Sequence, residues 1–191
     1  MNYSLALELY QQTTDSIKRL GFDKLKLWVE KNGFLECPAS TKYHLSIKGG
    51  LLVHSMNVVM MACELAKTLE FLDLEQIKII SIYHDLNKLG ILPYNLDTNN
   101  IIPKYLPKIN GGYSYNSACN NYPKENKEVG LQSVKMIAQF VVLSEDEKQA
   151  IELHDGPWIE GQAEKYRNNC SLGYLLHMAD WWSCFVLEKG M

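Results

Sequence analysis

Histidines and aspartates stand at three places in this sequence where apolar residues surround them. His54 lies inside GGLLVHSMNV, His84 and Asp85 are adjacent in SIYHDLNKLG, and Asp180 lies in LLHMADWW. A buried histidine–aspartate pair is costly unless another group satisfies both side chains. A divalent metal ion would do so, because imidazole nitrogen and carboxylate oxygen bind Zn, Mn, Fe, Co and Ni. We therefore expect the four side chains to converge on a metal site, as ligands do in helical bundles.

Each of these residues also has a purely structural interpretation. A histidine on an apolar helix face is often a core residue with a satisfied hydrogen bond, and an isolated aspartate is often paired with a lysine or caps a helix. The order along the chain favours the metal site, because a histidine is followed by a histidine–aspartate doublet and then by a distant aspartate.

The elements that must position these residues have mainly helical periodicity. Two N-terminal helices are expected within residues 1–32, with core positions at Leu5, Leu9, Ile17 and Leu20 in the first and at Phe22, Leu25 and Trp28 in the second. Apolar helices follow over 51–69 and 75–89, separated from the first two by a loop over 37–50. Further helices are predicted over 129–142, 145–154 and 171–188, and Ser144 with Glu147 forms a capping box. The prediction is a mainly α, single domain over 1–191.

Residues 90–127 interrupt the helical pattern. They are rich in Asn, Pro, Tyr and Gly, and INGGYSY predicts a β-hairpin. An irregular insertion of this length is often a lid or binding loop, although a tolerated surface excursion is an equally open interpretation. Tyr113 and Tyr115 would then cover the site or contact a partner subunit, so a homodimer is a plausible assembly.

Composition excludes several classes of protein. The chain has 191 residues and a formal net charge of −3, so no global basic field attracts duplex nucleic acid. No apolar run reaches the roughly 20 residues of a membrane span, and the N-terminus does not resemble a signal peptide. Five scattered cysteines without a CxxC pair indicate reduced thiols. We therefore expect a cytoplasmic protein with no membrane partner and a small anionic ligand.

The complete set of motifs resembles the HD-domain metal-dependent phosphohydrolases, in particular a small bacterial and phage branch. The family signature is a histidine, an HD doublet and a distant aspartate, which here are His54, His84-Asp85 and Asp180. The segments CPASTKYHLSIKGGLLVHSMNV, YHDLNKLG, AIELHDGPW and LLHMADWW are similar to the family's motifs, and the resemblance covers roughly residues 33–185. It implies an HD-domain helical bundle with the hairpin inserted between the HD helix and the later helices.

The resemblance also implies the cofactor, which is one divalent metal ion whose identity stays open among Mn, Co, Ni, Fe, Zn and Mg. Related members often carry a Gly-His-Gly-like motif before the helix that begins here near KEVGLQSV. This chain has Val129 at the place of that histidine, which favours a single ion. His154 leaves a second ion possible.

Several residues near the predicted centre have candidate roles toward a phosphate. Lys88 lies one turn after the doublet and could hold a phosphate oxygen, where some relatives have a glutamate for proton transfer; it could equally be a solvated lysine. His154 and Asp155 precede Gly-Pro-Trp and are expected at the mouth of the site. His154 could act as general acid or phosphate contact, or only meet the helix dipole.

Polar and aromatic residues further out are expected to contact the substrate. Ser40, Thr41, Lys42 and His44 could bind a nucleotide phosphate, although STKYH could also be an ordered turn. His177 would orient a metal ligand or belong to the core. Trp158, Trp181 and Trp182 could stack on a base, but aromatics at helical spacing are more often core residues.

The predicted function is hydrolysis of a phosphate ester or anhydride of a nucleotide, with deoxynucleoside mono- or triphosphates favoured, by a metal-activated water. One alternative is a phosphodiesterase that acts on a cyclic or short oligonucleotide. Another is a non-catalytic nucleotide sensor built on the same scaffold, for which the missing histidine motif and Lys88 leave room.

Overall fold

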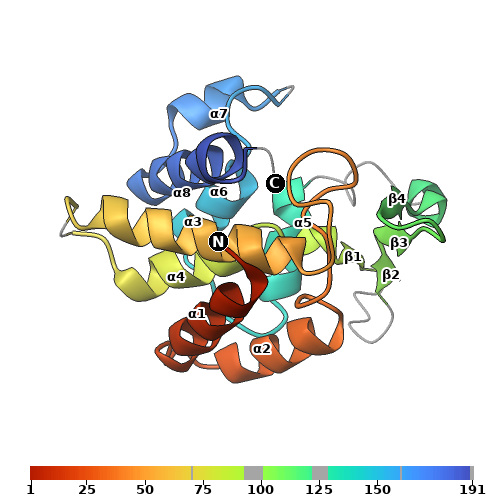
Figure 1. The fold of residues 1–191 in the computed structure, drawn as a ribbon. Helices are drawn as coiled ribbons and strands as arrows, with labels where there is room; N and C mark the ends of the chain where they lie inside the picture. The colour runs from red at the N-terminus through yellow and green to blue at the C-terminus, as the bar shows by residue number, and fades with distance from the viewer. Residues whose placement is uncertain (70, 93–100, 122–128, 160, 190–191) are drawn as a thin grey trace.

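In a computed structural model the chain is mainly helical, as predicted (Figure 1). The structure describes residues 1–69, 71–92, 101–121, 129–159 and 161–189. Its helices are α1 (Tyr3–Asp15), α2 (Phe22–Lys31), α3 (Gly50–Ala66), α4 (Leu74–Tyr83), α5 (Val129–Ile137), α6 (Glu145–Glu152), α7 (Ala163–Arg167) and α8 (Ser171–Trp182). Short turns of 3-10 helix are η1 (Leu86–Lys88) and η2 (Ser117–Asn121), and a π-helical turn, η4 (Ser183–Leu187), continues α8.

Helix α3 lies at the centre of the fold. It packs against α1, α4 and α8, and every residue from Gly50 to Val59 is buried. A helix that is apolar on all sides has this location because no face of it is suited to water. His54, in the middle of this stretch, is therefore held in the interior.

An aromatic cluster joins α1 and α2 to α4. The rings of Tyr10 and Tyr83 pack against Phe34, and Phe22 packs against Tyr83. The Tyr10 and Tyr83 hydroxyls lie 3.1 Å apart. The predicted core face of α2 is confirmed by burial of Phe22, Leu25 and Trp28.

The predicted core face of the first helix was partly wrong. Leu5 is 52% and Leu20 92% exposed, whereas Ala6 and Tyr10 are buried. Leu5 lies within α1, beside the buried positions Ala6 and Tyr10. Leu20 lies beyond the end of α1 at Asp15, where the Ser16 side chain donates back to the carbonyl of Thr13. Residues beyond this point no longer follow the helical spacing from which the face was predicted. Ile17 is nevertheless buried and Leu9 packs against the core.

The helix predicted over 75–89 ends six residues earlier than expected. Helix α4 ends at Tyr83, His84 is its C-cap, and Asp85 has a non-helical backbone (φ −103°, ψ 21°). The chain then continues as η1. The doublet thus lies where the backbone leaves the helix, so consecutive side chains can face one centre. The capping box of Ser144 and Glu147 at the start of α6 is confirmed.

The insertion forms two small antiparallel pairs at the edge of the molecule (Figure 1). Strand β1 (Gly90–Ile91) pairs with β2 (Ile102–Pro103), and β3 (Tyr105–Pro107) pairs with β4 (Tyr113–Tyr115). Gly111 and Gly112 have φ of 85° and 72° in the β3–β4 turn, a conformation that favours glycine and explains the hairpin signal of INGGYSY. The rest of the insertion, 93–100 and 122–128, is outside the described residues.

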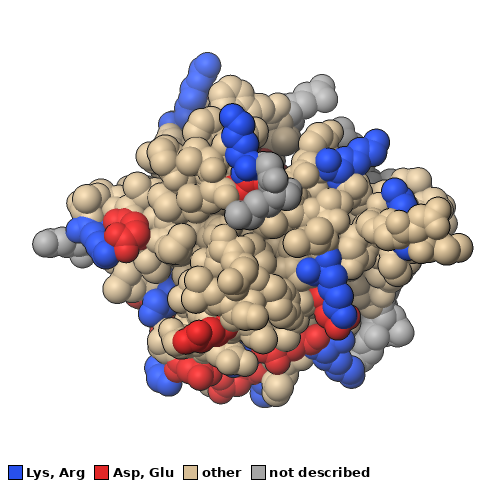
Figure 2. Space-filling model, viewed as in Figure 1, with Lys and Arg blue, Asp and Glu red and all other residues tan. Residues whose placement is uncertain are grey.

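The surface charge and the character of the helices agree with the composition. On the face shown in Figure 2, lysines and arginines are scattered and acidic side chains gather along one edge. Among the described residues, no helix combines the length and apolar character needed to cross a membrane.

Candidate metal centre

Three segments bring the four predicted ligands together. His54 comes from the middle of α3, His84 and Asp85 from the end of α4, and Asp180 from α8. His54 Nε2 lies 3.3 Å from His84 Nε2, 3.5 Å from Asp85 Oδ2 and 3.1 Å from Asp180 Oδ1. His84 Nε2 lies 3.6 Å from Asp85 Oδ2 and 3.8 Å from Asp180 Oδ1. Each of the two histidine Nε2 atoms thus has a carboxylate oxygen of Asp85 and one of Asp180 within 3.8 Å.

The ring orientations leave Nε2 as the atom that faces this point. His84 Nδ1 donates to the carbonyl of Ser81 at 3.0 Å, and His54 Nδ1 lies 3.1 and 3.2 Å from the two oxygens of Glu188. A neutral imidazole that donates through Nδ1 carries its lone pair on Nε2. Two such lone pairs 3.3 Å apart repel each other unless a proton or a cation lies between them.

The spacing fits a metal ion. Ligand atoms about 2.1 Å from one ion lie about 3.0 Å apart in octahedral and about 3.4 Å apart in tetrahedral coordination. The five distances that join a histidine Nε2 to another of these ligand atoms run from 3.1 to 3.8 Å. Imidazole and carboxylate donors suit several divalent ions. His54, His84 and Asp180 form one group that could hold a metal ion, and His84, Asp85 and His154 form another.

His154 lies deeper than the sequence predicted. It was expected at the mouth of the site, but its side chain is 2% exposed, its Nδ1 donates to the carbonyl of Ile151, and its Nε2 lies 3.6 Å from Asp85 Oδ1. The expectation was wrong for His154 because its ring, just after the C-cap Leu153 of α6, is directed at the buried Asp85; Gly156 follows with φ 86°, close to the ring of His177. Asp155 is 38% exposed and approaches His154 Nε2 at 3.8 Å.

Burial and charge separate the pKa values of the three central histidines. Burial lowers the pKa of His84 to about 4, against the attraction of Asp85. Burial also acts to lower the pKa of His54, but hydrogen bonds to Asp180 and Glu188 outweigh it and raise the value to about 9. The pKa of His154 rises to about 10 because Asp155 and Asp85 outweigh its burial. The centre therefore holds protons on His54 and His154 at neutral pH when no metal ion is bound.

The carboxylates stay ionised at neutral pH in spite of burial. Lys88 and His84 outweigh burial and hold the pKa of Asp85 well below its usual range. The hydrogen bond from His54 does the same for the pKa of Asp180. Lys88 Nζ lies 2.6 Å from Asp85 Oδ2, the oxygen that also faces the two histidines. Lys88 is thus at the edge of the centre, where an anionic ligand would meet it.

The loop between α2 and α3 brings only part of the predicted phosphate-binding set to the centre. His44 Nδ1 contacts Glu188 Oε2 at 2.5 Å, and His44 Nε2 lies 3.8 Å from Cys184 Sγ. Ser40 is used inside the loop, because its hydroxyl donates to the carbonyl of His44 and accepts from the Tyr43 amide. Thr41 is half-buried and Lys42 is exposed. STKYH is thus an ordered turn, and a phosphate-binding role for it stays a prediction.

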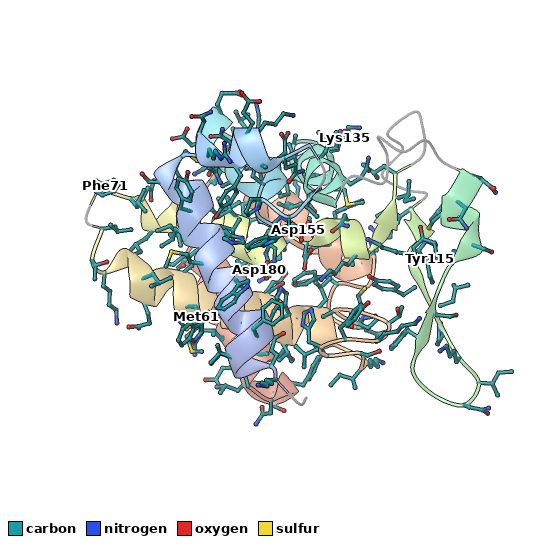
Figure 3. The ribbon with its side chains drawn as sticks, turned by 90° about the horizontal axis from the view of Figure 1, so that it is seen from above. Met61, Phe71, Tyr115, Lys135, Asp155 and Asp180 are labelled. Carbon is teal, nitrogen blue, oxygen red and sulfur yellow. The ribbon has the colours of Figure 1, made fainter. Side chains whose placement is uncertain are left out.

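The residues predicted farther from the metal centre have structural contacts or lie exposed at the surface. His177 Nδ1 donates to the carbonyl of His154 at 2.7 Å, so it supports the backbone of that segment. Trp158, Trp181 and Trp182 are 76%, 47% and 45% exposed, and Trp181 packs on Phe185. Asp155 and Asp180 lie in the middle of the molecule in Figure 3, whereas Tyr115 lies out on the hairpin. The expected homodimer stays a prediction.

Sequence reasoning missed Glu188, Cys184, Asn57 and Lys104. Glu188 is 1% exposed, and its carboxylate also accepts from Asn57 Nδ2 at 2.9 Å. Cys184 Sγ lies 3.6 Å from Asp180 Oδ1. Cys184 and Glu188 follow Asp180 at intervals of four residues, and this helical spacing is the signal that could have revealed these two residues. Lys104, from the base of the insertion, is mostly buried; burial lowers its pKa and Asp85 acts to raise it.

Comparisons with protein-family models, with curated proteins and with solved structures give no match to this chain. The assignment of the site therefore depends on its geometry and on the order of the motifs.

Proposed function

We propose that this protein is a metal-dependent phosphohydrolase of the HD type that acts on a nucleotide. The observation that carries the proposal is the convergence of His54, His84, Asp85 and Asp180, with Nε2 of both rings directed at the two carboxylates. The order of these residues is the order of the HD signature. The mainly helical fold, with the doublet at the end of one helix, is compatible with that family.

His54, His84, Asp85 and Asp180 would hold the ion. A bound divalent ion supplies Lewis acidity, which makes water a competent nucleophile at neutral pH and neutralises charge on a phosphoryl group. Lys88, beside Asp85 Oδ2, binds a phosphoryl oxygen and sets the orientation of the substrate. His154 carries a proton on Nε2 at neutral pH and donates it to the leaving oxygen, with Asp155 beside the ring.

The insertion contributes a further positive charge. Lys104 lies at the junction of β2 and β3, and its amide donates to the carbonyl of Leu89, just after η1. Lys88 and Lys104 together favour a ligand with several phosphoryl oxygens, for which a nucleotide is the simplest candidate. A deoxynucleoside mono- or triphosphate is the preferred substrate in this proposal.

The experiment that tests the proposal is a substrate panel. Purified protein is incubated with Mn²⁺, Co²⁺, Ni²⁺ or Mg²⁺ and with nucleoside mono-, di- and triphosphates, cyclic nucleotides and short oligonucleotides. We expect release of phosphate or pyrophosphate from a nucleotide. Turnover of cyclic or oligomeric substrates alone would favour the phosphodiesterase instead. Tight nucleotide binding by metal-loaded protein without any turnover would contradict the proposal and indicate a sensor.

A further inference from the structure

Glu188 is a buried carboxylate that the proposed reaction does not use. It follows the π-helical turn η4, and its amide donates to the carbonyl of Ser183 at 3.0 Å. Turns of π-helix occur often at functional sites. The side chain points back into the core, where burial acts to raise its pKa and hydrogen bonds from His44, His54 and Asn57 lower it below the usual range.

Three nitrogen atoms from two segments meet this carboxylate. Asn57 Nδ2 lies 2.9 Å from Oε1, His44 Nδ1 lies 2.5 Å from Oε2, and His54 Nδ1 lies 3.1 and 3.2 Å from the two oxygens. These are distances of N–H···O hydrogen bonds to an ionised acceptor. The contacts of Asn57 and His44 are shorter than the 3.1–3.8 Å that separate the ligand-type atoms around His54 Nε2. His44, His54, Cys184 and Glu188 also form a group that could hold a metal ion. The amide nitrogen of Asn57 can only donate, however, so Glu188 is occupied as an acceptor of N–H groups, and we place the ion on the Nε2 side of the His54 ring.

The effect on His54 follows from the ring chemistry. A ring whose Nδ1–H is donated to a carboxylate keeps Nε2 free, and the carboxylate also makes that nitrogen a better donor to a metal ion. For His84 the carbonyl of Ser81 has this role. For His54 the role falls to Glu188, because every described contact of its Nδ1 is to this carboxylate.

We infer that Glu188 is a positioning residue of the metal centre, which fixes the His54 ring with Nε2 toward the ion and ties the loop of His44 to the same point. This inference depends on the proposed metal centre and concerns how the chain assembles it. It adds the last helical turn to the elements that determine metal affinity.

The substitution Glu188→Gln tests it. Three N–H donors meet two oxygens, so an amide, which replaces one oxygen by a donor, sets two donors against each other and leaves the His54 Nδ1–H, which now lies near both oxygens, with at most one shared acceptor. Loss of an outer hydrogen bond to a metal-binding histidine typically weakens metal affinity about 10- to 100-fold. We expect a loss of this size for Zn²⁺ in a chelator-competition titration of the variant and the wild-type protein at the same pH.

Glu147→Gln is the matched control. Glu147 is also fully buried and accepts hydrogen bonds, from Arg19 and the Ser144 amide, but it belongs to α6 and its capping box. Its substitution should lower the free energy of unfolding and leave the Zn²⁺ affinity as in wild type. A merely structural Glu188 would behave in the same way.

A second measurement requires no variant. In the Zn²⁺-loaded wild-type protein with ¹⁵N-labelled histidine, the ring of His54 should show a metal-bound Nε2 and a slowly exchanging Nδ1–H. A metal-bound Nδ1, or Zn²⁺ affinity in Glu188→Gln equal to wild type, would overturn the inference alone. Failure of the wild-type chain to bind any divalent ion would overturn both this inference and the proposed function. Metal binding without nucleotide turnover would overturn only the proposed function.

Discussion

His54 would make metal binding at the proposed centre dependent on pH, because the same nitrogen binds a proton when the ion is absent. Its pKa in the metal-free centre is about 9, above the ordinary value of 6.5. At neutral pH a metal ion must therefore displace this proton, and below the pKa each pH unit changes the affinity about tenfold per proton released. We expect affinity to rise about tenfold per unit from about pH 7 to about pH 9 and then to level off.

A chelator-competition series over this pH range measures the slope. A slope of one proton corresponds to displacement from His54 alone. A slope near two would mean that His154, whose pKa is about 10, also binds the ion. Affinity that is independent of pH over the whole range would contradict the placement of the ion at His54.

Lys88 offers the second test at the scale of single residues. Its side chain is 16% exposed and its ammonium lies 2.6 Å from Asp85 Oδ2. Lys88→Met keeps the apolar stem and removes the charge. A hydrogen bond to a charged group contributes about 1.5–3 kcal/mol, so KM for the nucleotide should rise about 10- to 100-fold. Metal affinity should be retained or increase, because a competing cation is gone.

Steady-state kinetics and a metal titration on the same preparation check this expectation. Lys108→Met removes a lysine from the exposed β3–β4 turn and is the control, with kinetics expected to equal those of wild type. An unchanged KM in Lys88→Met would place the phosphate elsewhere.

At the scale of elements, the junction between the His44 loop and α3 is tightly packed. A Cβ on Gly50 would lie 2.0 Å from the carbonyl oxygen of Leu45 and 3.0 Å from the Ala39 amide nitrogen. Both contacts are to backbone, so the loop must move. Such overpacking typically costs about 1–3 kcal/mol. We expect Gly50→Ala to lower the free energy of unfolding by this amount and to weaken metal binding, because His44 is displaced from Glu188.

Urea unfolding and a metal titration measure the two effects. Met60→Ala, at a position of the same helix that is 40% exposed, should change neither by much. A Gly50→Ala protein as stable as wild type would show that the loop adapts without strain.

The elements also show what a sequence pattern can predict. The sequence pattern could identify four of the site residues, because each is a polar residue in an apolar run: His54, His84, Asp85 and Asp180. It could not identify the inward position of His154, because that ring is directed at Asp85 from just beyond the C-cap of α6 rather than from within the helix. Lys104 comes close enough to Asp85 for this carboxylate to influence the pKa of the lysine only through pairing of short strands. Glu188 has helical spacing from Asp180, but its hydrogen bonds depend on a π-helical turn.

For the molecule as a whole, the metal centre concentrates polar groups inside an otherwise apolar core. His54, His84, Asp85 and His154 are all buried, next to Lys88. Such groups are costly to bury unless they are paired. An ion that binds only the folded chain stabilises it by about 2.7 kcal/mol at a concentration 100 times its Kd. For a chain of this length that corresponds to a rise of roughly 5–11 °C in Tm.

Thermal unfolding of chelator-treated protein, with and without Mn²⁺ or Zn²⁺, tests this expectation. The variant to compare is Asp85→Ala, which removes a proposed metal ligand and also the carboxylate that pairs with Lys88. Loss of the Lys88 ion pair should lower the Tm of the metal-free variant. The informative quantity is therefore the metal-induced shift in Tm within each protein. We expect this shift to vanish in Asp85→Ala, together with the metal found in the purified protein and any nucleotide turnover. An Asp85→Ala protein that keeps its metal and its shift would mean that the fold binds the ion somewhere else.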